Sequence, residues 1–92
     1  MKNLSIIIPC YNSEKYILSN IEKLIKKLEA HDLNNYELII INDGSLDNTD
    51  KKIETILDNK KINLINNKKN KGKSFSIIYA LPLCKFDKVL LI

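Results

Sequence analysis

The amino-acid sequence predicts an α/β domain in which helices cover both faces of a mainly parallel β-sheet. Two observations lead to this fold class: short apolar runs recur along the chain, and segments with helical periodicity separate them. The expected order is β-α-β-α-β-α-β, in which each helix crosses over between parallel strands. A chain of 92 residues with 45% hydrophobic residues fits one small domain, or part of a larger one, with a thin core.

The first strand and the first helix are predicted at the start of the chain. Residues 4–8 form a short apolar run that Pro9 ends, as in a strand buried on both faces. Ser13 is the expected N-cap of the next helix, with Glu14 in its first turn. The helix itself is indicated by apolar residues at helical spacing: Ile17, Ile21, Leu24, Ile25 and Leu28.

The same alternation continues in the middle of the chain. Residues 36–41 predict a second buried strand, which runs directly into the polar segment NDGSLD. A second helix is expected over residues 47–57, because its apolar residues fall on one face. Ser45 or Asp47 can cap this helix.

The last part of the chain repeats the pattern once more. Residues 62–65 predict a short third strand, and the polar loop NNKKNKGK leads to a third helix from about Ser74. Pro82 is expected to end or kink this helix, because proline lacks the amide donor and clashes with the preceding turn. The segment KVLLI, residues 88–92, predicts a fourth strand, buried in the centre of a sheet.

Three loops follow the carboxyl ends of the first three predicted strands, where ligands bind in open parallel α/β sheets. In the first loop, PCYNSE, the ring of Tyr11 can stack on a flat base. The alternative is that Tyr11 covers the edge of the core and Asn12 forms an Asx turn. In the second loop, Asp43 can accept hydrogen bonds from a base or a ribose, and Gly44 can adopt the positive φ of a turn. The alternative for Asp43 is a turn or a helix cap.

The third loop offers groups that suit a phosphate. Lys71, Gly72 and Lys73 stand at the start of a predicted helix, where backbone amides and the helix dipole favour an anion. The alternative is an ordinary loop glycine, since the segment matches neither a Walker loop nor a GxGxxG fingerprint.

Charge is distributed unevenly along the chain, whose net charge is +4. Residues 1–58 carry seven Lys and ten acidic residues, whereas residues 59–86 carry seven Lys and no acidic residue. This basic segment is either a solvated face or lies near an anionic ligand. A nucleic-acid partner is not expected, because no aromatic residue interleaves residues 60–73. Cys10 and Cys84 are expected to be reduced thiols of a cytoplasmic protein.

Three segments together resemble the amino-terminal half of the inverting glycosyltransferases of family 2: LSIIIPCYNSEKYI, YELIIINDGSLDNT and NKKNKGKSFSIIYAL. The resemblance implies a Rossmann-like GT-A fold and a nucleotide-sugar donor linked to UDP or GDP. It also implies that Tyr11 and Asp43 hold the base, while Asn42 stands where the family usually has an acid. Asn70, Gly72 and Lys73 match the family element N-x-G-K-G, and Ser74 replaces its last glycine. The nucleotide-binding residues expected on this basis are Pro9, Tyr11, Asn12, Asp43, Gly44, Gly72 and Lys73.

The resemblance further implies a divalent metal, Mn²⁺ or Mg²⁺, held by a DxD motif directly after the fourth strand. That position follows Ile92, so no metal ligand and no catalytic residue is expected in residues 1–92. Residues 1–92 are accordingly expected to be a truncated nucleotide-binding half, with at most weak nucleotide binding and no sugar transfer. Membrane association would depend on parts of the protein outside this sequence.

Two other functions compete with this interpretation. A noncatalytic module could form a homodimer through an exposed sheet edge, because unpaired edges favour strand pairing. The second competing function is that of a nucleotidyltransferase-like domain. Such enzymes usually carry a glycine-rich signature near their first strand, whereas this chain has PCYNSE there.

Overall fold

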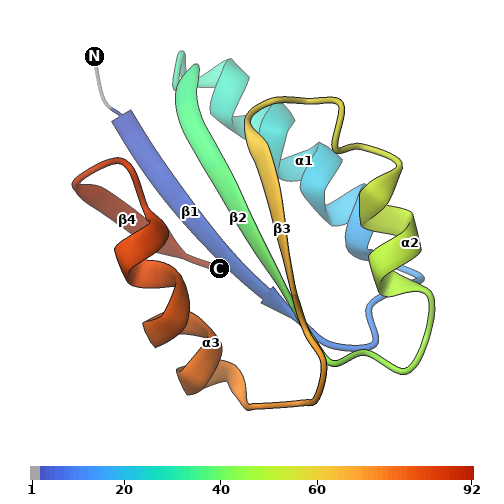
Figure 1. The fold of residues 1–92 in the computed structure, drawn as a ribbon. Helices are drawn as coiled ribbons and strands as arrows, with labels where there is room; N and C mark the ends of the chain where they lie inside the picture. Colours follow the sequence, from blue (N-terminus) through green and yellow to red (C-terminus); the bar gives the residue numbers. More distant parts are fainter. Residues whose placement is uncertain (1–2) are drawn as a thin grey trace.

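The computed structural model describes residues 3–92 and contains one parallel sheet with helices on both faces (Figure 1). All three strand pairings are parallel, and the strand order is β3-β2-β1-β4. The strands are β1 Asn3–Cys10, β2 Asn35–Asp43, β3 Ile62–Asn67 and β4 Lys88–Leu91. The helices are α1 Ile17–Ala30, α2 Thr49–Glu54, α3 Lys73–Ala80 and the 3₁₀ helix η1 Leu81–Leu83. The predicted fold class and element order are confirmed.

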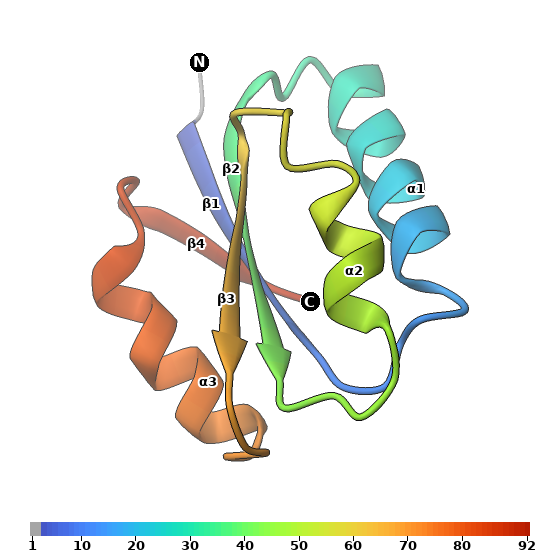
Figure 2. The same ribbon diagram turned by 45° about the vertical axis from the view of Figure 1, so that its right-hand side comes forward.

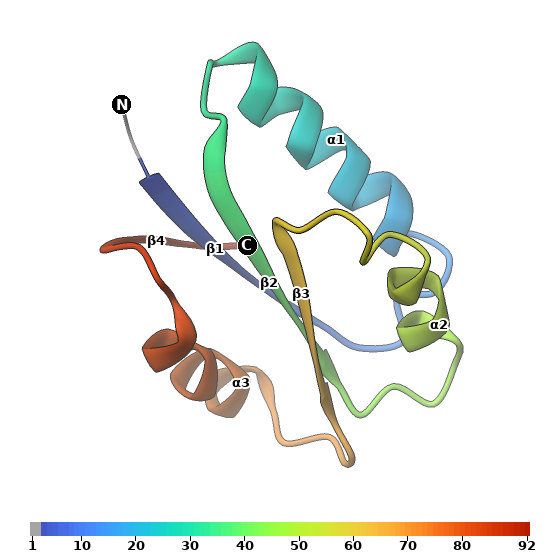
Figure 3. The ribbon, with the colours of Figure 1, turned by 45° about the horizontal axis from the view of Figure 1, so that its top comes forward.

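The sheet separates two apolar layers (Figures 1 and 3). α1 and α2 cover one face, and α3 covers the other. Because successive side chains of a strand point to opposite faces, Ile6 and Ile8 belong to the core cluster under α1 and α2. Ile7 and Ile39 instead pack with Ala80 of α3. The apolar runs are continuous because both faces of β1 and β2 are buried.

β2 and β3 each extend two residues beyond the predicted ends, into polar sequence. Asn42 and Asp43 still pair in the ladder with Asn66 and Asn67. Their side chains also bond across the strands: the Asn42 amide donates to Asn66 at 3.0 Å, and the Asn67 amide donates to Asp43 at 3.0 Å. Polar side chains therefore replace apolar packing in the last rungs of this ladder.

The predicted helix starts were partly wrong. α1 begins at Ile17, and the backbone carbonyl of Ser13, not its hydroxyl, accepts hydrogen bonds from the amides of Tyr16 and Ile17. Glu14 lies before the first turn, and its amide donates to Asp47 at 3.2 Å, which ties this loop to the loop after β2. A separate turn therefore precedes α1.

α2 is shorter than the predicted helix over residues 47–57. Residues beyond Glu54 continue as turns with i→i−3 hydrogen bonds, such as Ile56 N–H to the carbonyl of Ile53. Asp47 accepts a hydrogen bond from the Thr49 amide at 3.0 Å and so caps α2 from one position before the N-cap.

At the end of the chain, one expectation is confirmed and one is corrected. α3 ends at Ala80, and Pro82 lies in η1, as the missing amide donor of proline requires. β4 was expected to be a buried central strand, but it pairs only with β1 and forms an edge of this sheet. All four of its residues are exposed.

Candidate functional site

The carboxyl ends of β1, β2 and β3 meet at one end of the sheet, as Figure 2 shows. A cavity of about 270 Å³ opens there. Its lining is formed by Pro9, Cys10, Tyr11, Asp43, Asn70, Gly72 and Lys73. Five of the seven expected nucleotide-binding residues therefore surround one cavity, and Asn12 and Gly44 are not among them.

Asp43 is the most heavily hydrogen-bonded side chain of this cavity. Its Oδ1 accepts hydrogen bonds from the Lys71 amide at 2.8 Å and from the Asn67 side chain at 3.0 Å. Its Oδ2 accepts one from the Gly72 amide at 2.9 Å. The residue is only 5% exposed. Asp43 thus fastens the third loop to the end of β2, a role that neither sequence-based alternative included.

The same contacts determine the ionisation of Asp43. Burial by itself would raise the pKa of this carboxyl group. The hydrogen bonds from Lys71, Asn67 and Gly72 and the nearby Lys71 charge outweigh burial and hold the pKa below its ordinary value of 3.8. Asp43 is therefore a carboxylate at neutral pH, with acceptor capacity left on Oδ2.

Gly44 shapes the site through its backbone. Its φ of +71° confirms the predicted positive dihedral angle. A Cβ atom at this position would lie 2.4 Å from the backbone nitrogen of Asn70 and 2.5 Å from the carbonyl carbon of Lys69. Glycine is therefore required here both by the turn and by the close approach of the third loop.

Asn12 joins two loops and does not line the cavity. It adopts a positive φ of 50°, its side-chain oxygen accepts a hydrogen bond from the Leu46 amide at 2.8 Å, and its own amide donates to Ser45 Oγ at 2.9 Å. The loop after β1 is thereby fixed to the loop after β2. This arrangement holds Tyr11, the preceding residue, at the rim of the cavity.

Tyr11 and Lys73 contribute an aromatic ring and an ammonium group to the lining of the cavity. The Tyr11 side chain is 45% exposed, so its ring is available to a flat ligand. Lys73 is the first residue of α3, and its N-cap, Gly72, has a φ of +93°. An ammonium group and the positive end of a helix dipole therefore lie on one side of the cavity.

Three further residues shape this region, and sequence reasoning had not placed them in the site. Asn42 is buried; its amide donates to Asn66, and its oxygen accepts a hydrogen bond from Ser45. Asn70 lines the cavity and donates from its side chain to the Asp43 carbonyl at 3.2 Å. The N-x-G-K-G element contained the signal for Asn70.

Cys10 is the third of these residues, and no signal in the sequence identified it. Burial, followed by the charges of Asp47 and Asp43, raises the pKa of Cys10 to about 11. Its thiol is therefore protonated at neutral pH and is no nucleophile.

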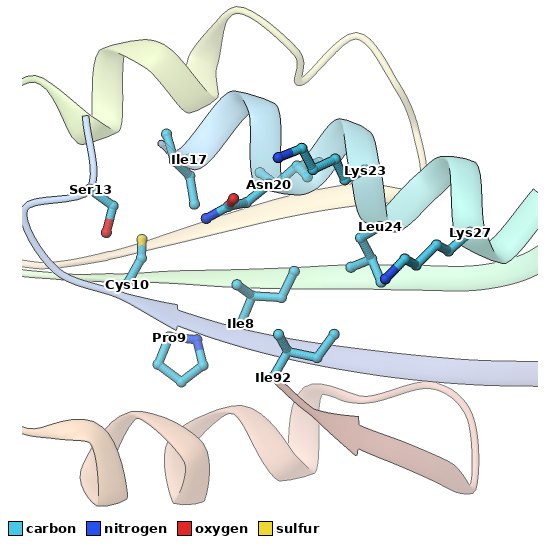
Figure 4. A pocket seen from close by; sticks show the side chains of 11 residues that line it. Ile8, Pro9, Cys10, Ser13, Ile17, Asn20, Lys23, Leu24, Lys27 and Ile92 are labelled. Atoms are coloured by element: carbon cyan, nitrogen blue, oxygen red, sulfur yellow. The ribbon is translucent and has the colours of Figure 1, made fainter. Parts of the chain in front are cut away.

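A larger cavity of about 440 Å³ lies between α1 and the sheet and shares Pro9 and Cys10 with the first. Figure 4 shows Ile8 and Ile92 on the sheet side, with Leu24 and Lys27 of α1 opposite. Its walls are mainly aliphatic. The polar groups that the sequence singled out converge on the smaller cavity, which is therefore the candidate site.

Residues 3–92 contain no group of three or more His, Cys, Asp or Glu side chains able to hold a metal ion. Asp43, the acid of the cavity, already accepts three hydrogen bonds from the chain. Within the same range, every helix is too short or too polar to cross a bilayer.

Comparison with known proteins identifies the family. The profile of Glycosyl transferase family 2 matches residues 5–92. The chain belongs to glycosyl transferase family 2. The resemblance of the three sequence segments to this family is thereby confirmed, and the parallel sheet is the GT-A architecture that it implied.

Two of the relatives that this chain resembles are named as transferases, and a third is uncharacterized. The human dolichyl-phosphate beta-glucosyltransferase is 30% identical, over 98% of this chain and 30% of that protein. An undecaprenyl-phosphate 4-deoxy-4-formamido-L-arabinose transferase of Proteus mirabilis is 33% identical, over 98% of this chain and 28% of that protein. An uncharacterized protein of Methanocaldococcus jannaschii is 39% identical, over 94% of this chain and 37% of that protein. The chain therefore spans at most 37% of the length of these three relatives.

The fold also matches a solved structure of a longer protein. The crystal structure of S. aureus TarS 1-349 in complex with UDP superposes with a TM-score of 0.79 at 27% identity. The match covers 99% of this chain and 27% of that one.

Proposed function

We propose that the cavity around Asp43 binds the nucleotide of a UDP- or GDP-linked sugar, as the donor site of an inverting glycosyltransferase. The observation that carries the proposal is the convergence of Tyr11, Asp43, Gly72 and Lys73, from three separate loops, on one cavity. Family membership supports it, and so does the similarity to a TarS structure solved with UDP.

Each of these residues has a distinct task in the proposal. The ring of Tyr11 stacks on the base, a contact worth about 1 to 3 kcal/mol in single-stranded nucleic-acid complexes. Oδ2 of Asp43 accepts a hydrogen bond from the base or the ribose, beside the one it accepts from Gly72. Lys73 and the amino end of α3 attract the diphosphate.

In the proposed reaction an acceptor hydroxyl attacks the anomeric carbon, a general base removes its proton, and the nucleoside diphosphate leaves with inversion. The part assigned to this chain is stabilisation of the negative charge that develops on the leaving diphosphate, through Lys73 and the α3 amino end. Residues 3–92 offer no metal cluster, so the Mn²⁺ or Mg²⁺ proposed for the full-length enzyme would be held by a DxD motif outside residues 1–92, where it would help to neutralise the leaving diphosphate.

We further propose that residues 1–92 alone bind nucleotide weakly and transfer no sugar. The cavity of about 270 Å³ is smaller than the roughly 300–1,000 Å³ typical of sites that enclose a whole ligand. Asp43 is committed to the third loop and is not free to serve as a base. His31, the single histidine, follows α1 near the amino end of β2, at the opposite end of the sheet.

Isothermal titration with UDP and GDP, with and without Mn²⁺, tests the proposal. Weak binding of one nucleotide, reduced by Tyr11→Leu, is expected. The matched control is Tyr16→Leu, an exposed tyrosine that does not line the cavity. Absence of binding by the folded protein would contradict nucleotide recognition, and measurable sugar transfer by residues 1–92 would contradict their assignment as a binding part only.

A further inference from the structure

The outer face of α3 is apolar, although the sheet covers only its inner face. Ser76 and Ala80 are buried on the inner side. Phe75, Ile78 and Tyr79 follow at i, i+3 and i+4 on the outer side and are 46%, 68% and 51% exposed. Leu81 and Leu83 of η1 continue the exposed apolar surface, and these five residues are called the α3 patch below.

α1 shows what an ordinary solvated helix of this chain looks like. Its exposed residues are mainly polar: Ser19, Asn20, Glu22, Lys23, Lys26, Lys27 and Glu29. The apolar stripe of α1 is accounted for by the core, whereas the α3 patch contributes nothing to either core cluster. Contiguous apolar surface of this kind marks an interaction site in a folded protein.

The patch is flanked by positive charge at both ends. Exposed lysines lie before α3 at positions 68, 69 and 71 and at its first residue, Lys73, and Lys85 follows η1. Residues 59–86 contain no acidic residue. Lys71 Nζ lies 5.6 Å from the centre of the Phe75 ring, and that ring stacks with Tyr79 at 6.2 Å between centroids and 10° between planes. Aromatic and basic groups thus form one continuous surface.

We propose that the α3 patch and its flanking lysines form a contact surface for a membrane that contains anionic lipids. Aromatic and leucine side chains enter the boundary between headgroups and acyl chains, and lysines bind the anionic headgroups. α3 lies on the side of the sheet opposite α1 and α2, so those helices do not obstruct the patch (Figures 1 and 2).

The composition favours a lipid surface over a protein partner. The exposed charges that flank the patch are the lysines at positions 68, 69, 71, 73 and 85, which match an anionic surface. Lysine is a flexible point charge that suits a diffuse layer of headgroups, and its methylene stem can lie along apolar surface. A protein partner would instead have to present an apolar groove framed by acidic residues at both ends.

The contact would also position the nucleotide cavity. Asp43 binds the amides of Lys71 and Gly72, so the amino end of α3 is fixed to the end of β2. A membrane held by the α3 patch would therefore lie beside the cavity lined by Lys73. This inference does not depend on nucleotide binding.

Vesicle co-sedimentation tests the inference. The protein should bind vesicles of phosphatidylcholine mixed with phosphatidylglycerol, bind neutral phosphatidylcholine vesicles far less, and lose binding as salt is raised. Replacing Phe75, Ile78 and Tyr79 together by Ser should weaken partitioning by about tenfold or more. Leu46→Ser is the matched control, because Leu46 is 87% exposed and lies outside the patch.

A second pair of variants tests the charges separately. Lys68→Gln with Lys69→Gln should weaken partitioning by about 30-fold, the effect of two lysines near an anionic surface. The same change at Lys51 and Lys52, an exposed pair on α2, should have little effect. Equal binding by patch and control variants would overturn the inference. The inference would also be overturned if the protein self-associated without lipid in analytical ultracentrifugation and only the patch substitutions abolished this self-association.

Discussion

The replacement Asp43→Asn tests how much Asp43 contributes to the stability of the fold, apart from its proposed role in nucleotide binding. The asparagine oxygen can still accept from Lys71 and Asn67, but its amide group then faces the amide of Gly72, and two donors oppose each other. One charge-assisted hydrogen bond is lost and two become neutral. Since bonds to a charged group contribute about 1.5–3 kcal/mol and neutral ones about 1 kcal/mol, we expect a loss of at least about 3 kcal/mol.

Urea unfolding followed by circular dichroism measures this loss. In thermal unfolding, a loss of about 3 kcal/mol should lower the Tm of a chain of this size by roughly 12–24 °C. Asp58→Asn is the matched control, because Asp58 is exposed and its substitution should change the free energy of unfolding by less than about 0.5 kcal/mol. Equal stability of the two variants would refute the conclusion that Asp43 fastens the third loop.

The pH dependence of unfolding provides an independent check. The pKa of Asp43 lies below its ordinary value of 3.8 in the folded protein, so the folded state favours the ionised form. The contribution of Asp43 to stability is fully present above this ordinary value and is lost as the pH falls through the lower folded pKa. The difference between the native protein and Asp43→Asn should therefore be constant near neutral pH and shrink only below pH 3.8. A difference that disappeared near neutral pH would contradict the assignment.

Three other predictions concern the same end of the sheet. Gly44→Ala should destabilise the fold by more than about 3 kcal/mol, and Gly72→Ala by about 1–3 kcal/mol, the cost of its backbone conformation alone. Both positions have a positive φ, but only at Gly44 would a Cβ clash with backbone; equal losses in urea unfolding would show that the clash is absent. Tyr11→Phe should retain UDP affinity, whereas Tyr11→Leu should weaken it about 5- to 150-fold in calorimetric titration, and equal affinities would exclude stacking. Cys10, with its pKa raised to about 11, should react with iodoacetamide at pH 8 only slowly until urea unfolds the chain. Rapid alkylation of Cys10 in the folded protein would contradict its burial.

The sequence predicted the layers of this fold correctly because apolar periodicity reports burial directly. The continuous run ending in Ile41 and the helical stripe from Ile17 to Leu28 both marked buried surfaces, and both are buried. The ends of elements were less accurate, since side-chain hydrogen bonds decide them. Asn42 and Asp43 appeared to belong to a turn, yet they extend β2 by bonding to Asn66 and Asn67.

The candidate site was predictable as a set of loops but not as a set of contacts. The positions of Tyr11, Asp43 and Lys73 follow from topology, because loops at the carboxyl ends of parallel strands converge. Two other features depend on atoms brought together by folding: the Asp43 bonds to Lys71 and Gly72, and the link from Asn12 to Leu46. No local pattern encodes a contact between residues 28 or more positions apart.

The most direct measurement of the central claim is an NMR titration of the ¹⁵N-labelled protein with UDP and GDP. We expect one of these nucleotides to shift the amide resonances of Tyr11, Asp43, Gly72 and Lys73 together. The resonances around Asn35, at the opposite end of the sheet, should stay in place. Shifts confined to the α1 cavity near Lys23 and Lys27, or no shifts with either nucleotide in large excess, would contradict a nucleotide site at Asp43.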